Sequence, residues 1–128
     1  MILARRAVGK SCSSVPLIEG DVVELDAGDS TGRAQQGRRP ALIVSVNALQ
    51  SALGVAIVCA VATHGGRPAQ ARNDLEVLVP PGLAITGVIL PHQLRTIDLR
   101  ARNATKLGTV PRVTLLAVRA RLQALLGV

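Results

Sequence analysis

The stretch of residues 20–45, GDVVELDAGDSTGRAQQGRRPALIVS, decides the fold of this chain. It has the pattern of a strand, a polar loop that carries arginine, and a second strand that is apolar throughout. The middle of the stretch, DAGDSTG, consists largely of turn-forming residues. Pro40 biases the preceding Arg39 toward extended backbone. The sequence therefore predicts an arginine held where a loop becomes a strand.

The same alternation of apolar runs and turn residues continues along the chain. Clusters of Gly, Pro, Asn and Ser separate the runs, and this spacing predicts a small antiparallel barrel. We expect strands at about residues 21–26, 41–48, 54–63, 74–79, 86–91, 93–98 and 105–110.

The last segment, residues 110–128, changes to a helical period and is expected to form an amphipathic helix. Pro111 suits the first turn of this helix and Gly127 its end. We expect the helix to pack on the barrel with its apolar face, formed by Leu115, Val118, Leu122, Leu125 and Leu126.

The composition fits one domain in 128 residues, mainly β with a C-terminal α-helix. No Phe, Trp or Tyr is present, so the core must consist of Val, Leu, Ile and Ala, which favours strands. Residues 1–19 have no periodic pattern and are expected to be a flexible extension ahead of a domain at residues 20–128.

The charge indicates the class of partner. Fifteen Lys and Arg against eight Asp and Glu give a net charge of +7, and most of the cations are arginines. Arginine matches phosphate groups well, so a polyanionic partner is expected, although a solubilising surface charge is an alternative. Neither Cys12 nor Cys59 has the spacing of a metal site or a disulfide, and we expect reduced thiols in a cytoplasmic protein.

Three motifs, in order, resemble the MazF/PemK family of toxin-antitoxin endoribonucleases. The first is Gly20-Asp21 followed by the G-x-R-P of residues 37–40. The second is the apolar run that ends in Ala62, Thr63 and His64. The third is PHQLRTIDLRARNATKLGTV, residues 91–110. The resemblance covers about residues 20–127.

This resemblance implies an SH3-like barrel that forms a homodimer and acts as the toxin of a type II toxin-antitoxin system. It implies cleavage of single-stranded RNA, with mRNA as the expected target, by attack of the RNA's own 2′-hydroxyl. The products would be 2′,3′-cyclic phosphate and 5′-hydroxyl ends. The implied partner is a cognate antitoxin with an acidic, disordered tail, and no metal or other cofactor is implied.

Arg39 and Thr63 occupy the family's two catalytic positions. Arg39 can neutralise the phosphorane oxygens, and Thr63 can donate to a non-bridging oxygen. Because the pKa of arginine lies above about 12, we interpret Arg39 as an electrostatic stabiliser and possible proton donor, and leave the general base unassigned. His64 and His92 are both candidates for that base.

Further residues are expected to contact RNA. Gln93 can pair with a base edge, and the guanidinium planes of Arg33 and Arg38 can stack on bases where relatives use aromatic rings. Alternation along an extended segment places Arg100 and Arg102 on one side, where they could track phosphates. The full set of predicted RNA contacts is Arg33, Arg38, His64, His92, Gln93 and Arg95.

Two alternatives stay open. Ala34 stands where the family often places a glutamate, so the chain could be a non-catalytic basic barrel that binds RNA, as a degenerate toxin or a ribosome-associated module. The other alternative is a CcdB-like barrel that poisons DNA gyrase. That family depends on a C-terminal tryptophan, and this chain ends in LLGV.

Overall fold

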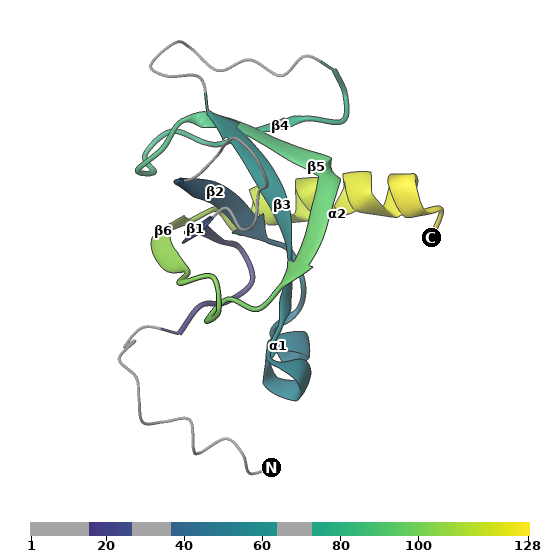
Figure 1. Cartoon of the computed structure of the whole chain (residues 1–128). Helices are drawn as coiled ribbons and strands as arrows, with labels where there is room; N and C mark the ends of the chain where they lie inside the picture. Colours follow the sequence, from purple (N-terminus) through teal and green to yellow (C-terminus); the bar gives the residue numbers. More distant parts are fainter. Residues whose placement is uncertain (1–15, 27–36, 64–72) are drawn as a thin grey trace.

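The computed structural model describes residues 16–26, 37–63 and 73–128. Their strands form one antiparallel sheet in the order β4-β5-β3-β2-β1-β6, which curls into a partial barrel (Figure 1). This confirms the predicted mainly-β fold with a C-terminal helix. The elements are β1 (Asp21–Asp26), β2 (Arg38–Ile43), α1 (Asn47–Leu53), β3 (Ala56–Thr63), β4 (Val77–Leu78), β5 (Gly87–Ile97), β6 (Thr105–Thr109) and α2 (Arg112–Leu126).

The helix α1 corrects the strand predicted at residues 41–48, because β2 ends at Ile43. The α1 sequence, NALQSAL, is rich in Ala, Leu and Gln, which favour helix. Gly54 ends the helix with a left-handed backbone, φ 76°, and its N–H donates to the carbonyl of Gln50. No residue of α1 is buried, and the helix projects from the sheet (Figure 1).

The strand β5 is continuous where two strands, 86–91 and 93–98, were predicted. Its register against β3 jumps, because Cys59 pairs with Leu94 and the next residue, Ala60, pairs with Leu90. Residues 91–93 lie between these pairs and form a bulge, which we call the β5 bulge. A bulge bends a strand and changes the direction of its side chains. The break predicted between the two strands falls at this bulge.

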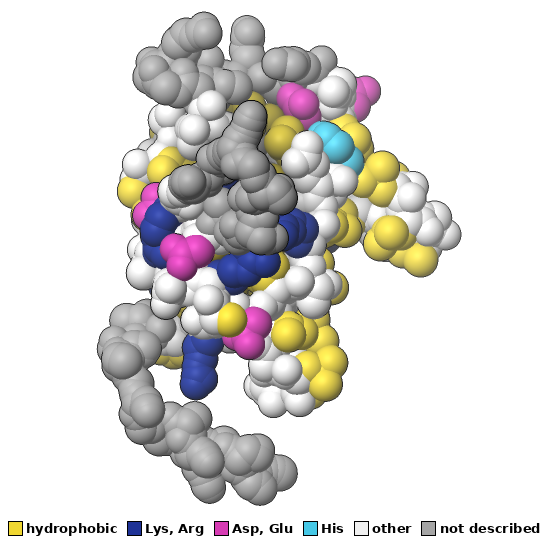
Figure 2. Space-filling model, viewed as in Figure 1, with side chains coloured by type: hydrophobic (Ala, Val, Ile, Leu, Met, Phe, Trp, Pro, Cys, Tyr) yellow, Lys and Arg dark blue, Asp and Glu magenta, His cyan; other side chains and the backbone are white. Residues whose placement is uncertain are grey.

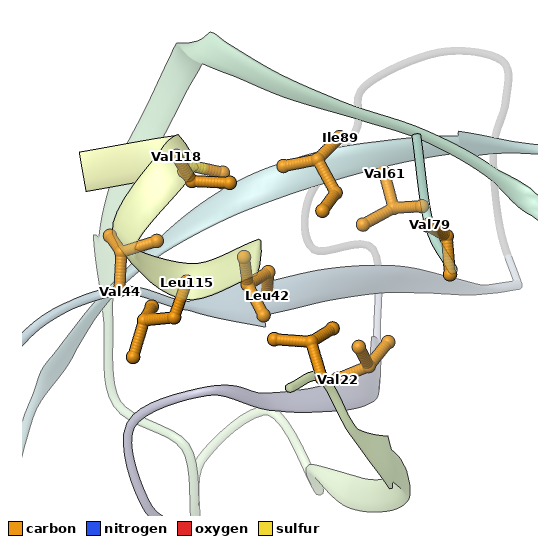
Figure 3. Close-up of a cluster of buried hydrophobic side chains, with 10 residues drawn as sticks. Val22, Leu42, Val44, Val61, Val79, Ile89, Leu115 and Val118 are labelled. Atoms are coloured by element: carbon orange, nitrogen blue, oxygen red, sulfur yellow. The ribbon is translucent and has the colours of Figure 1, made fainter. Parts of the chain in front are cut away.

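Apolar side chains pack on both faces of the sheet, because consecutive strand residues point to opposite sides. The face covered by α2 carries the helix-side core, part of which Figure 3 shows. The other face carries the outer core. The helix-side core contains Val22, Leu42, Val44, Cys59, Val61, Val79, Ile89, Val110, Leu115 and Val118. The outer core contains Val23, Leu25, Ala41, Ile43, Ala56, Val58, Ile97 and Leu99.

The thiol of Cys59 belongs to the helix-side core and is fully buried. Burial raises its pKa to about 12, so the group stays protonated and behaves as a small apolar side chain. The other cysteine, Cys12, lies outside the described residues.

The helix α2 buries less of its apolar face than the sequence predicted. Leu115 and Val118 are buried, but Leu125 and Leu126 are 46% and 64% exposed. The C-terminal half of α2 extends past the edge of the sheet (Figure 1), so the last two leucines have no core to enter. Pro111 is the N-cap, one residue before the helix, and Gly127 is the C-cap.

The Gly20-Asp21 motif has a structural role at the start of β1. Asp21 is fully buried, and its carboxylate accepts hydrogen bonds from the Ile18 N–H at 2.9 Å and from the Thr109 hydroxyl at 2.7 Å. The ammonium group of Lys106 lies 3.6 Å away. A buried carboxylate with such partners is satisfied, and here it fixes the turn before β1 to β6.

We expect Gly87→Ala to lower the free energy of unfolding by about 1–3 kcal/mol. A Cβ atom on Gly87 would collide with the carbonyl oxygen of Ala62, which is backbone and cannot move aside. At Gly108 the added Cβ would meet the flexible Leu83 side chain, with Cδ2 at 2.8 Å, so Gly108→Ala is the matched control and should cost less. Urea unfolding of both variants measures this, and equal losses would contradict it.

Candidate functional site

A cavity of about 470 Å³ opens on the outer-core face of the sheet. Strand β2, the β5 bulge and the segment after β5 surround it. Its lining combines apolar side chains at the base with several cations. The lining residues are Leu25, Asp26, Arg39, Pro40, Ala41, Val58, Ala60, His92, Gln93, Leu94, Arg95, Ile97 and Arg102.

Small side chains under the cavity leave room for Arg39. Ala41 in β2 pairs with Ala60 in β3, and both line the base. Arg39 stands two residues before Ala41, so strand alternation directs its side chain to the same face of the sheet. Arg39 is exposed and lines the cavity. The predicted arginine thus stands near the start of strand β2, above the small side chains that line the base of the cavity.

The β5 bulge brings two more predicted residues to the same cavity. His92 and Gln93 belong to the bulge, and both are exposed. Pro91, the first residue of the bulge, is buried and anchors it, and a proline suits a bulge because it has no N–H for the ladder. Arg95 follows on β5 and completes the group. Four of the predicted site residues therefore line one cavity: Arg39, His92, Gln93 and Arg95.

Thr63 lies apart from this group. It is the exposed last residue of β3 and pairs with Gly87 of β5. It stands three residues after Ala60, so alternation directs its side chain to the opposite face of the sheet. Thr63 is not among the cavity-lining residues of the described chain. The other two predicted residues, Arg33 and His64, lie outside the described residues.

Arg38 is engaged in hydrogen bonds within the protein. Its guanidinium group donates to Asp26, to the carbonyls of Glu24 and Asn103, and to the Thr105 hydroxyl. Hydrogen bonds from Asn103 and from Arg38 hold the pKa of Asp26 below its ordinary value of 3.8. Asp26 is therefore a carboxylate at neutral pH, at the edge of the cavity.

The expectation that Arg100 and Arg102 lie along an extended segment was wrong. The Asp98 carboxylate accepts hydrogen bonds from the N–H groups of Arg100 and Ala101, and this closes a turn. Asp98 favours such a turn because its short side chain bonds the backbone two residues on. Only Arg102 of the two arginines lines the cavity. Asp26 was missed as a member of the site, since its position at the end of β1 gives no motif.

The chemistry of this site suits a phosphate ester. Arg39, Arg95 and Arg102 offer planar donors that match phosphate oxygens. One imidazole and one amide, from His92 and Gln93, add a proton acceptor and a group that can pair with a base edge. Lys and Arg side chains gather near the middle of the face in Figure 2, with acidic groups beside them.

Metal-ligating clusters and membrane-spanning helices are both absent from the described part of the chain. Within residues 16–26, 37–63 and 73–128, no group of three or more His, Cys, Asp or Glu side chains is arranged to hold a metal ion. Over the same residues, no helix has the length and apolar character needed to cross a membrane.

Comparison with known families gives a match over most of the chain. The family described as PemK-like, MazF-like toxin of type II toxin-antitoxin system matches residues 18–126. Endoribonuclease PemK of Escherichia coli is 34% identical over 107 residues, which are 84% of this chain and 80% of that protein. Endoribonuclease toxin MazF of Escherichia coli strain K12 is 31% identical over 108 residues, 84% of this chain and 92% of that protein.

Solved structures show the same likeness. A crystal structure of MazF from Deinococcus radiodurans superposes with a TM-score of 0.73 at 33% identity, over 90% of this chain and 100% of that one. A MazE-MazF crystal structure from the same organism gives a TM-score of 0.72 at 31% identity, over 89% of this chain and 98% of that one. The similarity therefore includes the three-dimensional arrangement as well as the sequence motifs.

Proposed function

Because the chain belongs to the family of PemK-like, MazF-like toxins of type II toxin-antitoxin systems, we propose that it is an endoribonuclease whose RNA site is the cavity on the outer-core face. The observation that carries this proposal is that Arg39, His92, Gln93 and Arg95 line one cavity although they come from two strands. Cleavage proceeds at short motifs in single-stranded RNA by attack of the 2′-hydroxyl on the adjacent phosphate. The bond from phosphorus to the 5′-oxygen breaks, the leaving oxygen takes up a proton, and a 2′,3′-cyclic phosphate and a 5′-hydroxyl remain.

Arg39 stabilises the phosphorane in this mechanism. Attack by the 2′-oxygen places extra negative charge on the non-bridging oxygens, and a guanidinium group above an apolar floor can meet that charge with two aligned hydrogen bonds. Thr63 remains a proposed donor to a non-bridging oxygen on its motif position alone, because strand alternation directs its side chain to the face opposite the cavity and it does not line the cavity.

His92 is the general base that we propose. Its imidazole is exposed on the β5 bulge and shares the cavity with Arg39. Histidine is the side-chain type that most readily accepts and returns a proton near neutral pH. A base is required because the 2′-hydroxyl must lose its proton as it attacks.

Gln93, Arg95 and Arg102 bind the RNA strand on either side of the cleaved bond. The Gln93 amide pairs with a base edge, and the two arginines contact neighbouring phosphates. Arg33 remains a proposed stacking partner for bases and His64 a proposed RNA contact from its motif position, and both lie outside the described residues.

The partners follow from the family. We propose that the toxin forms a homodimer, acts in the cytoplasm on mRNA, and is inhibited by a MazE-like antitoxin whose acidic, disordered tail occupies the basic cavity. Complementary charge supports this, because Arg39, Arg95 and Arg102 all line the cavity. Residues 20–128 form the catalytic domain in this proposal. Residues 16–19 of the predicted flexible extension are held against it, because the Glu19 N–H donates to Oδ1 of Asn47 and Arg119 donates to the Glu19 carboxylate, and the rest of that extension lies outside the described residues.

The proposed activity is tested with the purified protein and a long RNA of mixed sequence in EDTA. We expect cuts at one short motif, with 5′-hydroxyl ends and 2′,3′-cyclic phosphates, and no loss of rate relative to buffer with Mg²⁺. Ends are mapped by primer extension, and a 5′-kinase labels only the ends that carry a hydroxyl. RNA that is bound but stays intact would instead support the non-catalytic RNA-binding barrel.

A further inference from the structure

Arg38 joins three segments of the chain, although it stands beside the residue that faces the cavity. Its Nη1 donates to Oδ1 of Asp26 at 3.0 Å, and its Nη2 donates to the carbonyl oxygen of Glu24 at 3.0 Å. Nη2 also lies 2.8 Å from the carbonyl oxygen of Asn103 and 2.8 Å from the hydroxyl of Thr105. The guanidinium group thus connects the end of β1, the turn after β5 and the start of β6.

Asp26 and Asn103 complete this arrangement. The Asn103 Nδ2 donates to Oδ2 of Asp26 at 2.7 Å, so the carboxylate accepts from Arg38 on one oxygen and from Asn103 on the other. Asn103 has φ 51°, in the left-handed region that asparagine tolerates better than most residues. We call Arg38, Asp26 and Asn103 the Arg38 cluster.

The Arg38 cluster is connected to two arginines that line the cavity. Arg39 follows Arg38 directly in β2, and strand alternation directs their side chains to opposite faces of the sheet. Arg102 precedes Asn103, and its Nη1 donates to the carbonyl oxygen of Asp26 at 3.3 Å. The Asp26 N–H in turn donates to the carbonyl oxygen of Arg102 at 3.0 Å. A shift of the cluster therefore moves both cavity arginines.

We propose that the Arg38 cluster is a positioning device for RNA cleavage, which holds Arg39 and Arg102 at a fixed separation so that Arg39 engages the phosphate at the cleaved bond while Arg102 engages the neighbouring phosphate. This inference rests on the proposed function. Donors that are fixed before the reaction stabilise developing charge without having to reorganise. Arg38 is a positioning residue in this account, and its guanidinium acts through its neighbours in place of the base stacking expected from the sequence.

Two substitutions separate positioning from stability. Arg38→Lys keeps the charge, but a single ammonium group cannot reach the acceptors that the guanidinium fork serves. Asn103→Gly removes the hydrogen bond to Asp26 and keeps the positive φ, which glycine adopts readily. Arg112→Lys is the matched control, because Arg112 is exposed at the start of α2 and does not line the cavity.

We expect both cluster variants to lower kcat by about 10- to 100-fold, the loss that follows a displacement of about 1 Å in a catalytic group. KM should change far less than kcat, and the Arg112→Lys control should match wild type in both. Tm should stay within about 4 °C of wild type. An NMR titration without RNA should show the pKa of Asp26 rising toward 3.8 in both variants, because each removes a hydrogen bond that lowers it.

The outcomes are distinct. If wild type cleaves RNA and both cluster variants keep the wild-type kcat, the positioning role is refuted while the proposed function stands. The positioning role is also refuted if the cluster variants have a lower Tm than wild type but an unchanged kcat per folded molecule. If wild type fails to cleave any RNA, the proposed function fails, whereas the NMR titration still shows whether Arg38 and Asn103 hold the Asp26 carboxylate.

Discussion

The Arg39→Ala variant is expected to cleave RNA at least about a hundredfold more slowly than wild type, the loss seen when one donor to a developing oxyanion is removed. Arg39 is exposed and lies above small side chains, so truncation leaves the packing of β2 unchanged. The loss should therefore appear in kcat, without a lower Tm. Single-turnover cleavage of a short RNA that contains the mapped motif measures the effect directly.

Arg39→Lys refines this prediction. Lysine keeps the positive charge but cannot make two parallel hydrogen bonds to one phosphate, so its rate should fall between those of wild type and Arg39→Ala. Arg112→Ala removes an equal charge outside the cavity and should cleave as wild type does. Wild-type rates for Arg39→Ala would refute the role of this residue in the reaction.

His92→Asn should lower the rate of cleavage by about a hundredfold at neutral pH, if the imidazole removes the 2′-proton. Asparagine is similar in size and can still form hydrogen bonds, so binding of RNA should change little. A general base works only when deprotonated, so the wild-type rate should rise with pH, and the variant should lack that rise.

The pH profile distinguishes a base from a binding residue. If His92 only contacts a nucleotide, His92→Asn will raise KM and leave the shape of the profile as in wild type. A change in the cleavage motif with an unchanged pH profile of the rate would also contradict the role of His92 as the base. His92 is exposed on the β5 bulge, so equal urea unfolding curves for both proteins are expected and serve as the control for folding.

The sequence predicted the parts of this molecule that depend on local pattern. Alternating apolar residues and turn-forming clusters located β1, β3 and β6 to within a few residues, and the helical period located α2. The motifs also identified Arg39, His92, Gln93 and Arg95 before the structure showed that they share a cavity. Alternation along β2 was sufficient for Arg39, whereas the adjacent residues His92 and Gln93 both reach the cavity because they lie in the β5 bulge.

Other features depend on contacts between distant segments, which a single sequence does not show. The helix α1 was missed because residues 41–48 were interpreted as one continuous strand, which ran past the end of β2 into the start of the helix. The role of Arg38 was hidden because its acceptors, Asn103 and Thr105, lie 65 and 67 residues away in the chain. The face that Thr63 presents depends on strand register, and the sequence motif gave only its position at the end of β3.

The β5 bulge has a consequence for how such a protein could diversify. His92 and Gln93 lie where the pairing of β5 with β3 jumps from Leu90 to Leu94, so their side chains stand outside the regular ladder. Because His92 is the proposed base, exchange of Gln93 alone should alter which nucleotides are read, with little effect on the barrel or on the reaction. A directed library at position 93, on an otherwise constant scaffold, is thus a direct route to ribonucleases with new target sequences.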